Sequence, residues 1–317
     1  MKILVVGAGA TGGYFGGRLL QAGRDVTFLV RAKRAAELAA SGLKIRSPFG
    51  DATLDRPPTV TAGKLDRTFD LVLLSCKAYD LDNAIDDFAP AVGPDTLVLP
   101  LLNGMRHVDV LDARFGRARV PGGLCAIAAT LDEQRNIVHL NELHSLTFGG
   151  RDASQADRIR ELSGTLSDAG FNARASDTIV HDMWEKWIFL ATLASATCLM
   201  RASVGQILIA PGGRDLVSGL FDECSAIASA AGYGPREFFT ERGLAMLTDE
   251  RSTLTASMLR DLESGSRIEA DHVVGDLLRR QNGKRYAAPL SLLRIAFTHL
   301  KAYEARRTST SQKPENH

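Results

Sequence analysis

The first half of the chain alternates short apolar runs with longer stretches of helical periodicity. The apolar runs are rich in Val, Leu and Ile and are bounded by turn residues, which is typical of strands buried on both faces of a sheet. This alternation predicts an α/β fold with a parallel, doubly wound sheet. The predicted strands are Lys2–Val6, Asp25–Val30, Phe69–Cys76 and Thr96–Leu101, and helical patterns between them include Gly12–Ala22 and Ala32–Ser41.

Three further strand-like segments follow, separated by glycine-rich and polar turns. They cover Gly123–Leu131, Ile137–Leu140 and Ser145–Gly149. Apolar and polar positions alternate in them, so we expect an antiparallel extension of the sheet.

Helical periodicity dominates the second half, from about Ser176 onward. The turn-rich residues 170–178 separate the two patterns, which predicts a first domain over 1–175 and an all-helical second domain over 176–305. The polar segment Arg306–His317 is predicted to be a disordered tail. The predicted helices are Ile179–Met200, Arg214–Ala231, Arg236–Thr248, Met258–Arg260 running into Ile268–Gln281, and Leu290–Glu304.

Composition excludes several classes of partner. The chain has 317 residues, 45% of them hydrophobic, and a formal net charge of +1, so nothing favours binding to nucleic acid or to an anionic membrane surface. The longest apolar run, Ile188–Met200, is too short to span a bilayer. His139 and His144 are the nearest histidine pair and have no third ligand at a suitable offset, so no metal site is expected. The scattered cysteines predict reduced thiols in a cytoplasmic protein: Cys76, Cys125, Cys198 and Cys224.

The first predicted strand leads into a glycine-rich loop that matches GxGxxG and opens a helix. In this context Gly7 permits the tight turn, Gly9 lets a pyrophosphate approach the backbone, and Gly12 lets the helix pack closely on the strand. The free N–H groups of the helix N-terminus then face the phosphates. A glycine-rich turn without a ligand is the alternative. The predicted cofactor-binding residues of the loop are Gly7, Gly9, Ala10, Thr11 and Gly12.

The end of the second predicted strand indicates which nicotinamide cofactor binds. NAD-specific folds place an Asp or Glu there for the ribose 2′-hydroxyl, whereas this strand ends at Arg31, with Lys33 and Arg34 just beyond. Arginine can grip a 2′-phosphate with two hydrogen bonds, so the sequence favours NADP(H) over NAD. A solvated basic start of a helix is the alternative, and the helix dipole opposes it.

Lys186 is the most informative residue of the second half. It stands at the beginning of a helix that is apolar nearly all round. Desolvation lowers the pKa of a lysine in such a place and makes proton donation easier near neutral pH. A lysine that extends to solvent, or one paired with Asp182 four residues earlier, explains the pattern equally well.

Other candidates are weaker when taken singly. Asn103 and Lys77 follow predicted strands at the carboxyl edge of the sheet, where open α/β sheets bind ligands, although turn chemistry also explains Asn103. Glu269 and Ser257 are ordinary helix residues by themselves.

Together these residues resemble the ketopantoate reductase family over nearly the whole chain. The motifs that carry the resemblance are KILVVGAGATGGYFGGRL at the start, FLVR at Arg31, LLSCKAYD at Lys77, LLNGM at Asn103, MWEKW at Lys186 and ASMLRDLESGSRIEADHVVGDLLRR near the end.

The resemblance implies a Rossmann-type N-terminal domain, a helical C-terminal domain and NADPH-dependent reduction of 2-dehydropantoate to pantoate, a step toward coenzyme A. It implies that Lys186 is the general acid and that Glu269 supports this lysine and binds the substrate. It further implies that Asn103 and Lys77 line the nicotinamide end, that Asn103 also contacts the substrate, and that Ser257 binds the carboxylate region of the substrate.

One departure concerns the substrate. The family commonly has asparagines four and eight residues after the lysine, where this chain has Leu190 and Ala194. Each buried polar group of the substrate left unpaired costs about 1–3 kcal/mol. The substrate is therefore either ketopantoate, with Thr192 or Ser195 supplying the missing bonds, or a more apolar branched or aromatic 2-oxo acid. A non-catalytic NADPH-binding sensor is a third alternative. The apolar surface of the helical half is sufficient for a homodimer interface.

Overall fold

The computed structural model describes residues 1–281 and 291–311. They form two compact units, one of Met1–Leu102 with His107–Val180, the other of Asn103–Arg106 with the residues from His181 onward. The division in the sequence therefore falls five residues after the predicted boundary at 175. Ile179 explains the shift, because its side chain is 1% exposed and packs on Gly149 of the first unit.

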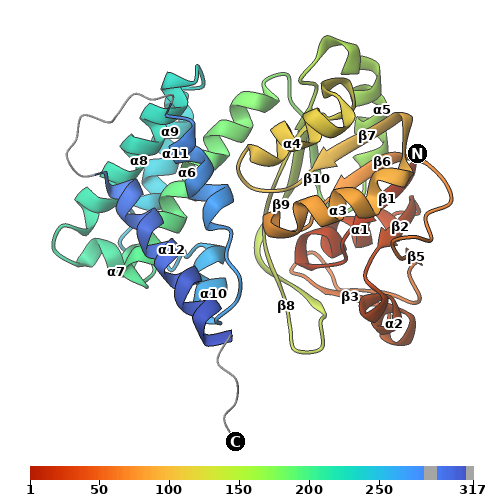
Figure 1. The fold of residues 1–317 in the computed structure, drawn as a ribbon, viewed down its shortest axis with the longest axis horizontal. Helices are drawn as coiled ribbons and strands as arrows, with labels where there is room; N and C mark the ends of the chain where they lie inside the picture. The colour runs from red at the N-terminus through yellow and green to blue at the C-terminus, as the bar shows by residue number, and fades with distance from the viewer. Residues whose placement is uncertain (282–290, 312–317) are drawn as a thin grey trace, which may run out of the picture. The chain divides into compact units, whose positions relative to one another are not determined.

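A parallel sheet forms the centre of the first unit (Figure 1). Its strand order is β5-β2-β1-β6-β7, and every neighbouring pair is parallel, which confirms the predicted doubly wound fold. The strands are β1 (Lys2–Val6), β2 (Asp25–Leu29), β5 (Thr59–Val60), β6 (Phe69–Leu74) and β7 (Val92–Pro100).

Helices cover both faces of this sheet, as the side-chain alternation of β1 shows. Ile3 and Val5 belong to a core formed with helices α1, α2 and α5, whereas Leu4 and Val6 belong to a second core formed with α3 and α4. Burial of both faces explains why the strands are continuous apolar runs. The helices are α1 (Ala10–Gln21), α2 (Ala32–Ser41), α3 (Leu81–Phe88), α4 (Arg106–Phe115) and α5 (Ala156–Leu166).

The segments after residue 122 form a second sheet, so the expected extension of the first sheet is wrong. Its long strand β9 (Ile137–Gly149) combines two predicted strands into one. The antiparallel pairing with β8 (Gly122–Leu131) is as predicted, and its register shifts between Ile127 and Ala129. At that shift the side-chain amide oxygen of Asn141 accepts a bond from the Ala128 N–H, which keeps β9 continuous. The remaining strands are β3 (Leu43–Arg46), β4 (Ala52–Leu54) and β10 (Asn172–Ala175).

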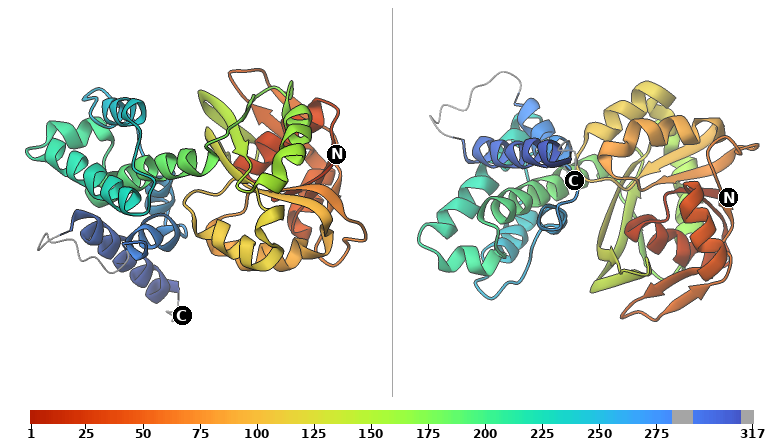
Figure 2. Two further views of the ribbon diagram at one scale, coloured as in Figure 1. Left: turned by 90° about the horizontal axis from the view of Figure 1, so that it is seen from above. Right: turned by 60° about the horizontal axis from the view of Figure 1, so that its bottom comes forward.

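The second unit is helical throughout its described residues from 181 onward, and Figure 2 shows the green helix α6 (Ile179–Met200) among the teal and blue helices of this unit. The predicted bounds of α6 are confirmed. The segment predicted as one helix over Ile268–Gln281 is a π-helical turn, η5 (Asp271–Gly275), followed by α11 (Asp276–Arg279). The other helices are α7 (Val204–Ile209), α8 (Gly213–Ala230), α9 (Glu237–Leu247), α10 (Ser257–Glu263) and α12 (Leu292–Ser311).

The prediction of a disordered tail from residue 306 is wrong for residues 306–311, which continue helix α12. Tyr303 and Arg307 hold this end of the helix by donating hydrogen bonds to the Ser266 carbonyl (2.7 Å) and the Gly265 carbonyl (3.0 Å). Residues 312–317 of the predicted tail, and Leu290 of the predicted last helix, lie outside the described residues. In the part of the chain that is described, no helix combines the length and the apolar character needed to cross a membrane.

Candidate functional site

The glycine loop between β1 and α1 has little room for side chains. Gly7 has a φ of +95°, a left-handed conformation that favours glycine. A Cβ on Gly12 would lie 2.0 Å from the Ser75 Oγ and 2.4 Å from the Gly7 carbonyl oxygen. A Cβ on Gly9, in contrast, would meet no atom of the described chain within 4 Å. The backbone conformation at Gly7 and the close packing at Gly12 thus explain these two glycines, whereas Gly9 borders open space.

Ser75 supports the loop from the end of β6. Its hydroxyl donates to the Val6 carbonyl at 2.9 Å, and its N–H approaches the same oxygen at 3.3 Å. Strand β6 ends at Leu74 and not at the predicted Cys76. Nothing in the sequence pattern singled out Ser75, because a serine after a strand is common.

Helix α1 starts immediately after the first glycines of this loop. It begins at Ala10, and its N-cap, Gly9, has no side chain to accept a bond from the first turn. The first-turn N–H groups of a helix lack carbonyl partners within the helix and carry a partial positive charge. Ala10, Thr11 and Gly12 supply these groups, as predicted for a phosphate-binding loop.

Arg31 lies at the end of β2, next to the glycine loop. The Leu29 carbonyl, two residues earlier, accepts a hydrogen bond from the Gly7 N–H at 3.0 Å. The Arg31 side chain is 78% exposed and contacts Asp80 at 3.3 Å. Arg34, in contrast, is buried and donates to Glu37 at 3.1 Å and to the Arg135 carbonyl at 3.3 Å. Only the side chain of Arg31, and not that of Arg34, is therefore placed to meet a ligand at this edge.

Lys77 lies at the same edge of the sheet, three residues after the end of β6. It is the N-cap of a short 3-10 turn, η1 (Ala78–Asp80), and its carbonyl accepts the Asp80 N–H at 2.9 Å. Since Arg31 contacts Asp80, both predicted cations flank this turn. The carboxyl ends of β1, β2 and β6 thus bring together the loop, Arg31 and Lys77.

These residues fit a dinucleotide phosphate. Gly9 borders open space, no side chain caps the N–H groups at the α1 N-terminus, and the guanidinium at the end of the neighbouring strand is exposed. A pyrophosphate needs the first two features, and a ribose 2′-phosphate suits the third. Gly7, Gly9, Ala10, Thr11, Gly12, Arg31 and Lys77 would hold the cofactor.

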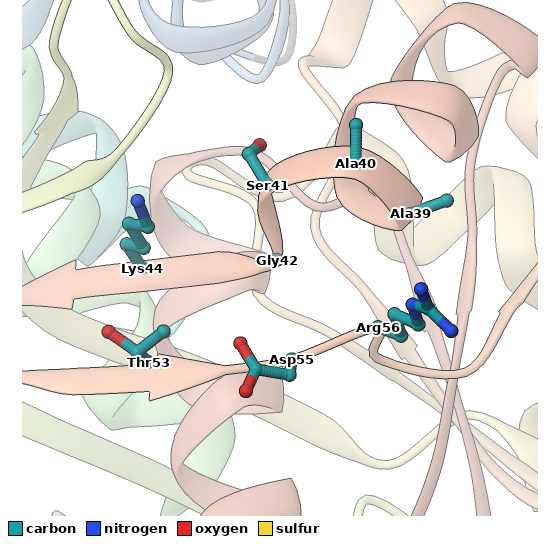
Figure 3. Close-up of a pocket in the computed structure, with 8 residues that line it drawn as sticks. All are labelled: Ala39, Ala40, Ser41, Gly42, Lys44, Thr53, Asp55 and Arg56. Carbon is teal, nitrogen blue, oxygen red and sulfur yellow. The ribbon is translucent and has the colours of Figure 1, made fainter.

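A separate pocket of about 690 Å³ lies at the far end of α2 (Figure 3). The pocket is formed by the last turn of α2 together with strands β3 and β4 and the residues just after β4, and it contains none of the predicted site residues. Helix α2, which follows Arg31, separates the two by its length of about 15 Å. The lining residues are Ala39, Ala40, Ser41, Gly42, Lys44, Thr53, Asp55 and Arg56.

In the second unit, Lys186 is half-buried on α6 among buried neighbours that include Glu185 and Trp187. Arg236 donates to the Glu185 carboxylate at 2.9 Å and to Asp182 at 2.5 Å. These two carboxylates raise the pKa of Arg236, with the Glu185 hydrogen bond as the largest contribution. Asp182 was the alternative partner of Lys186 in the sequence analysis. In the structure its carboxylate forms an ion pair with Arg236.

Glu269 lies on a segment that is hydrogen-bonded to α6 at Trp187, the residue after Lys186. The Trp187 indole N–H donates to the Val273 carbonyl at 2.7 Å, and the Val273 N–H donates to the Glu269 carbonyl at 3.0 Å. Glu269 is half-buried and lies two residues before the start of the π-helical turn η5. Such turns are frequent at functional sites. The structure therefore brings the segments of the two predicted catalytic residues together.

Asn103, which follows β7, belongs to the second unit. Its backbone forms a hydrogen bond with the ring of His272, a buried side chain of η5. Gly104, with a φ of +79°, packs directly on the same histidine. Sequence reasoning missed His272, because nothing in the pattern separated it from its charged neighbours.

Ser257 is exposed at the first position of α10, and the contact that positions it is distant from Lys186. The preceding N–H, of Ala256, donates to the Thr197 hydroxyl of α6 at 3.4 Å. Thr197 is eleven residues from Lys186, about 16 Å along the helix. No contact joins Ser257 to Lys186 among those seen in the described residues.

The face of α6 that continues from Lys186 carries Leu190, half-buried, and Ala194, 3% exposed. Thr192 and Ser195 do not replace the missing asparagines, since both are wholly buried. The Thr192 hydroxyl donates within its own helix to the Ile188 carbonyl at 2.9 Å. Among residues 1–281 and 291–311, no group of three or more His, Cys, Asp and Glu side chains could hold a metal ion.

Comparisons with known proteins agree with this arrangement. The family model described as Ketopantoate reductase PanE/ApbA matches residues 3–153, and the model of its C-terminal part matches residues 178–304. An uncharacterized oxidoreductase of Bacillus subtilis (strain 168), YkpB, is 36% identical over 97% of this chain and 100% of its own length.

Two solved structures share the fold. The crystal structure of 2-dehydropantoate 2-reductase from Geobacter metallireducens GS-15 has a TM-score of 0.85 and 28% identity, over 95% of this chain and 99% of that chain. D-mandelate dehydrogenase, solved with NADH and anilino(oxo)acetate, also has a TM-score of 0.85, at 21% identity over 97% of this chain and 100% of that chain. The second likeness concerns the fold alone.

Proposed function

The chain belongs to the ketopantoate reductase family, and from that premise we propose that it reduces 2-dehydropantoate (ketopantoate) to pantoate with NADPH, a step toward pantothenate and coenzyme A. It is an oxidoreductase of this family and depends on a pyridine nucleotide. The observation that carries the proposal is Lys186, a half-buried lysine on an apolar helix, fastened through Trp187 to the segment of Glu269.

In this mechanism the chain supplies a proton and orientation. NADPH, when bound, supplies the hydride that reduces the ketone carbon. The Lys186 Nζ donates its proton to the ketone oxygen as negative charge develops there, which is general-acid catalysis. Glu269 supports the lysine and accepts a hydrogen bond from the substrate, which Asn103 also contacts. The family resemblance assigns the carboxylate region of the substrate to Ser257, a role that the contacts of Ser257 and Lys186 in the described residues do not themselves support.

The preference for NADPH is supported by Arg31. Its guanidinium is exposed at the position where NAD-specific folds place a carboxylate. Its contact with Asp80 is a surface ion pair, worth about 0–1 kcal/mol, so a 2′-phosphate can compete for the guanidinium.

A second candidate is the reduction of a more apolar 2-oxo acid, branched or aromatic. Leu190 and Ala194 favour it, because they follow Lys186 at helical spacing and offer no hydrogen bond to a substrate hydroxyl. Thr192 and Ser195 are wholly buried and cannot supply one instead.

The test is turnover by the purified protein, followed through NADPH absorbance, with 2-dehydropantoate and with a panel of branched and aromatic 2-oxo acids. Strong turnover of 2-dehydropantoate that is lost in Lys186→Ala supports the first candidate. Preference for an apolar acid supports the second, and the double variant Leu190→Asn with Ala194→Asn should then move preference toward 2-dehydropantoate by about tenfold or more. NADPH binding without turnover of any acid would show that the chain is a sensor.

The cysteines of the described residues are not joined in disulfides, which also supports action in the cytoplasm: Cys76, Cys125, Cys198 and Cys224.

A further inference from the structure

A buried histidine holds the backbone of Asn103. The His272 side chain is 6% exposed, and its ring forms a hydrogen bond with the backbone of Asn103. This bond favours the protonated form of the ring, so the ring nitrogen donates and the Asn103 carbonyl accepts. Asn103 is therefore attached to η5 through its main chain.

The next residue fits closely against the same histidine. A Cβ on Gly104 would lie 2.9 Å from the His272 carbonyl oxygen and 3.2 Å from its ring Cδ2. Gly104 also has a left-handed φ of +79°, which disfavours other residues. The chain at 103–104 thus follows the surface of His272 without a side chain between them.

His272 is connected in turn to the segment of Glu269. Its own N–H donates to the Glu269 carbonyl at 3.2 Å. Burial lowers the pKa of His272, while the carboxylates of Glu269 and Asp276 oppose this effect and Arg106 adds to it. The ring is accordingly neutral near pH 7 and has one N–H to donate.

We propose that His272 is a positioning residue that fixes Asn103 relative to Glu269, so that both side chains keep a constant geometry toward the 2-oxo acid. The inference rests on the proposed function for the role of Asn103. It adds a residue that contacts the Asn103 backbone and acts through it.

The experiment compares His272→Leu, which removes the donor, with His272→Gln, whose amide retains one. His299→Leu is the matched control, because His299 also bonds a backbone group, that of Cys198, at the other end of α6. We expect His272→Leu to lower kcat/KM about tenfold, His272→Gln to retain most of it, and His299→Leu to change it little.

A double-mutant cycle with Asn103→Ala tests whether His272 acts through Asn103. If it does, His272→Leu costs much less in the Asn103→Ala background, and the two effects do not multiply. Amide hydrogen exchange of residues 103–106 should speed up in His272→Leu but not in His272→Gln or His299→Leu. Gly104→Ala, whose methyl group would push the same segment away from His272, should also speed this exchange.

Two results would overturn the proposal: unchanged exchange in His272→Leu, or losses in the cycle that multiply independently. Thermal unfolding of each variant separates either result from general destabilisation. The exchange measurement does not depend on turnover. It therefore tests whether His272 holds the backbone of Asn103 even if no 2-oxo acid is reduced and the proposed function fails.

Discussion

The two units of the molecule carry their candidate functional residues in different ways. In the first unit the candidate cofactor site consists largely of backbone. Gly7 has a left-handed backbone, a Cβ on Gly12 would clash with the Ser75 Oγ, and the Ser75 hydroxyl donates to the Val6 carbonyl. In the second unit the site consists of side chains on packed elements, with Lys186 on α6 and Glu269 before η5.

This difference determines what a substitution does. A backbone site is lost when a methyl group displaces the loop, and binding and stability then fall together. A side-chain site can lose its chemistry while the fold persists, because a half-buried polar group contributes little to the core. Substitutions in the two units should therefore separate cofactor binding from turnover.

The largest expected effect is that of Lys186→Ala. Removal of the general acid should lower kcat by about 10²–10⁴-fold, while the NADPH dissociation constant changes little because the loop is in the other unit. Steady-state kinetics and NADPH fluorescence measure the two quantities.

Lys186→Arg is the control for this prediction. Arginine keeps the positive charge but does not release its proton in the neutral range, so kcat should stay low. Full activity of either variant would show that Lys186 only extends to solvent.

Gly12→Ala and Gly9→Ala form a matched pair within the loop. The methyl group of Gly12→Ala would meet the Ser75 Oγ at 2.0 Å, so we expect a loss of about 1–3 kcal/mol in the free energy of unfolding together with loss of NADPH binding. Gly9→Ala meets nothing within 4 Å, so stability should hold while NADPH binds about tenfold more weakly or worse.

Chemical denaturation and NADPH titration distinguish the two glycines. Unchanged NADPH affinity in Gly9→Ala would mean that no pyrophosphate approaches this glycine, and the loop would then be only a turn.

Arg31→Ala should have a smaller effect. Loss of a charge-assisted hydrogen bond at an exposed site should raise the NADPH dissociation constant about tenfold and leave NADH binding unchanged. Lys33→Ala, another exposed cation on the same helix, is the control and should alter neither. Equal losses for NADPH and NADH in Arg31→Ala would remove the argument for the 2′-phosphate.

Hydrophobic periodicity predicted the elements that have one strong pattern. The bounds of α2 and α6 follow from helical spacing, and β1 from an apolar run after Met1. The short strands β3, β4, β5 and β10 were missed, because two to four residues carry no period. Strands β3 and β10 pair with β9, β4 pairs with β3, and β5 pairs with β2, and these pairings depend on the tertiary fold.

The candidate site shows the same limit. The sequence pointed to the glycine loop as a candidate, because each glycine has a local reason to be there, and the family motifs pointed to Lys186 and Glu269. It could not identify Ser75 or His272, whose importance lies in contacts with Val6 and Asn103, far away along the chain. It also named Arg34 with Arg31 and Lys33 as cations at the end of the second strand, whereas Arg34 is buried and bonded to Glu37 and to the Arg135 carbonyl.

The smallest effect concerns the side chains around His144 in the first unit. It tests whether cofactor binding in that unit depends on the backbone of the loop alone or also on a buried side chain. The Tyr14 hydroxyl, on the helix that carries the loop, contacts the His144 Nδ1 of β9 at 3.0 Å. Burial lowers the pKa of His144, and the neighbouring His139 and Arg18 add to this effect. The ring is therefore neutral in the folded protein at pH values where an unfolded histidine, with a pKa of about 6.5, begins to bind a proton.

Between the two pKa values the unfolded chain binds more protons, so the free energy of unfolding should fall as the pH drops below about 6.5 and should be fully retained above it. His272 and His299 have pKa values lowered in the same direction, so His144→Gln should make this decline shallower without abolishing it. Denaturant unfolding from about pH 7.5 to about pH 5.5 measures the slope. If NADPH affinity at neutral pH is unchanged in His144→Gln, the cluster supports α1 without shaping the loop. If the affinity falls as well, the loop depends on a buried side chain on β9, and the contrast between the units is weaker than the glycines suggest.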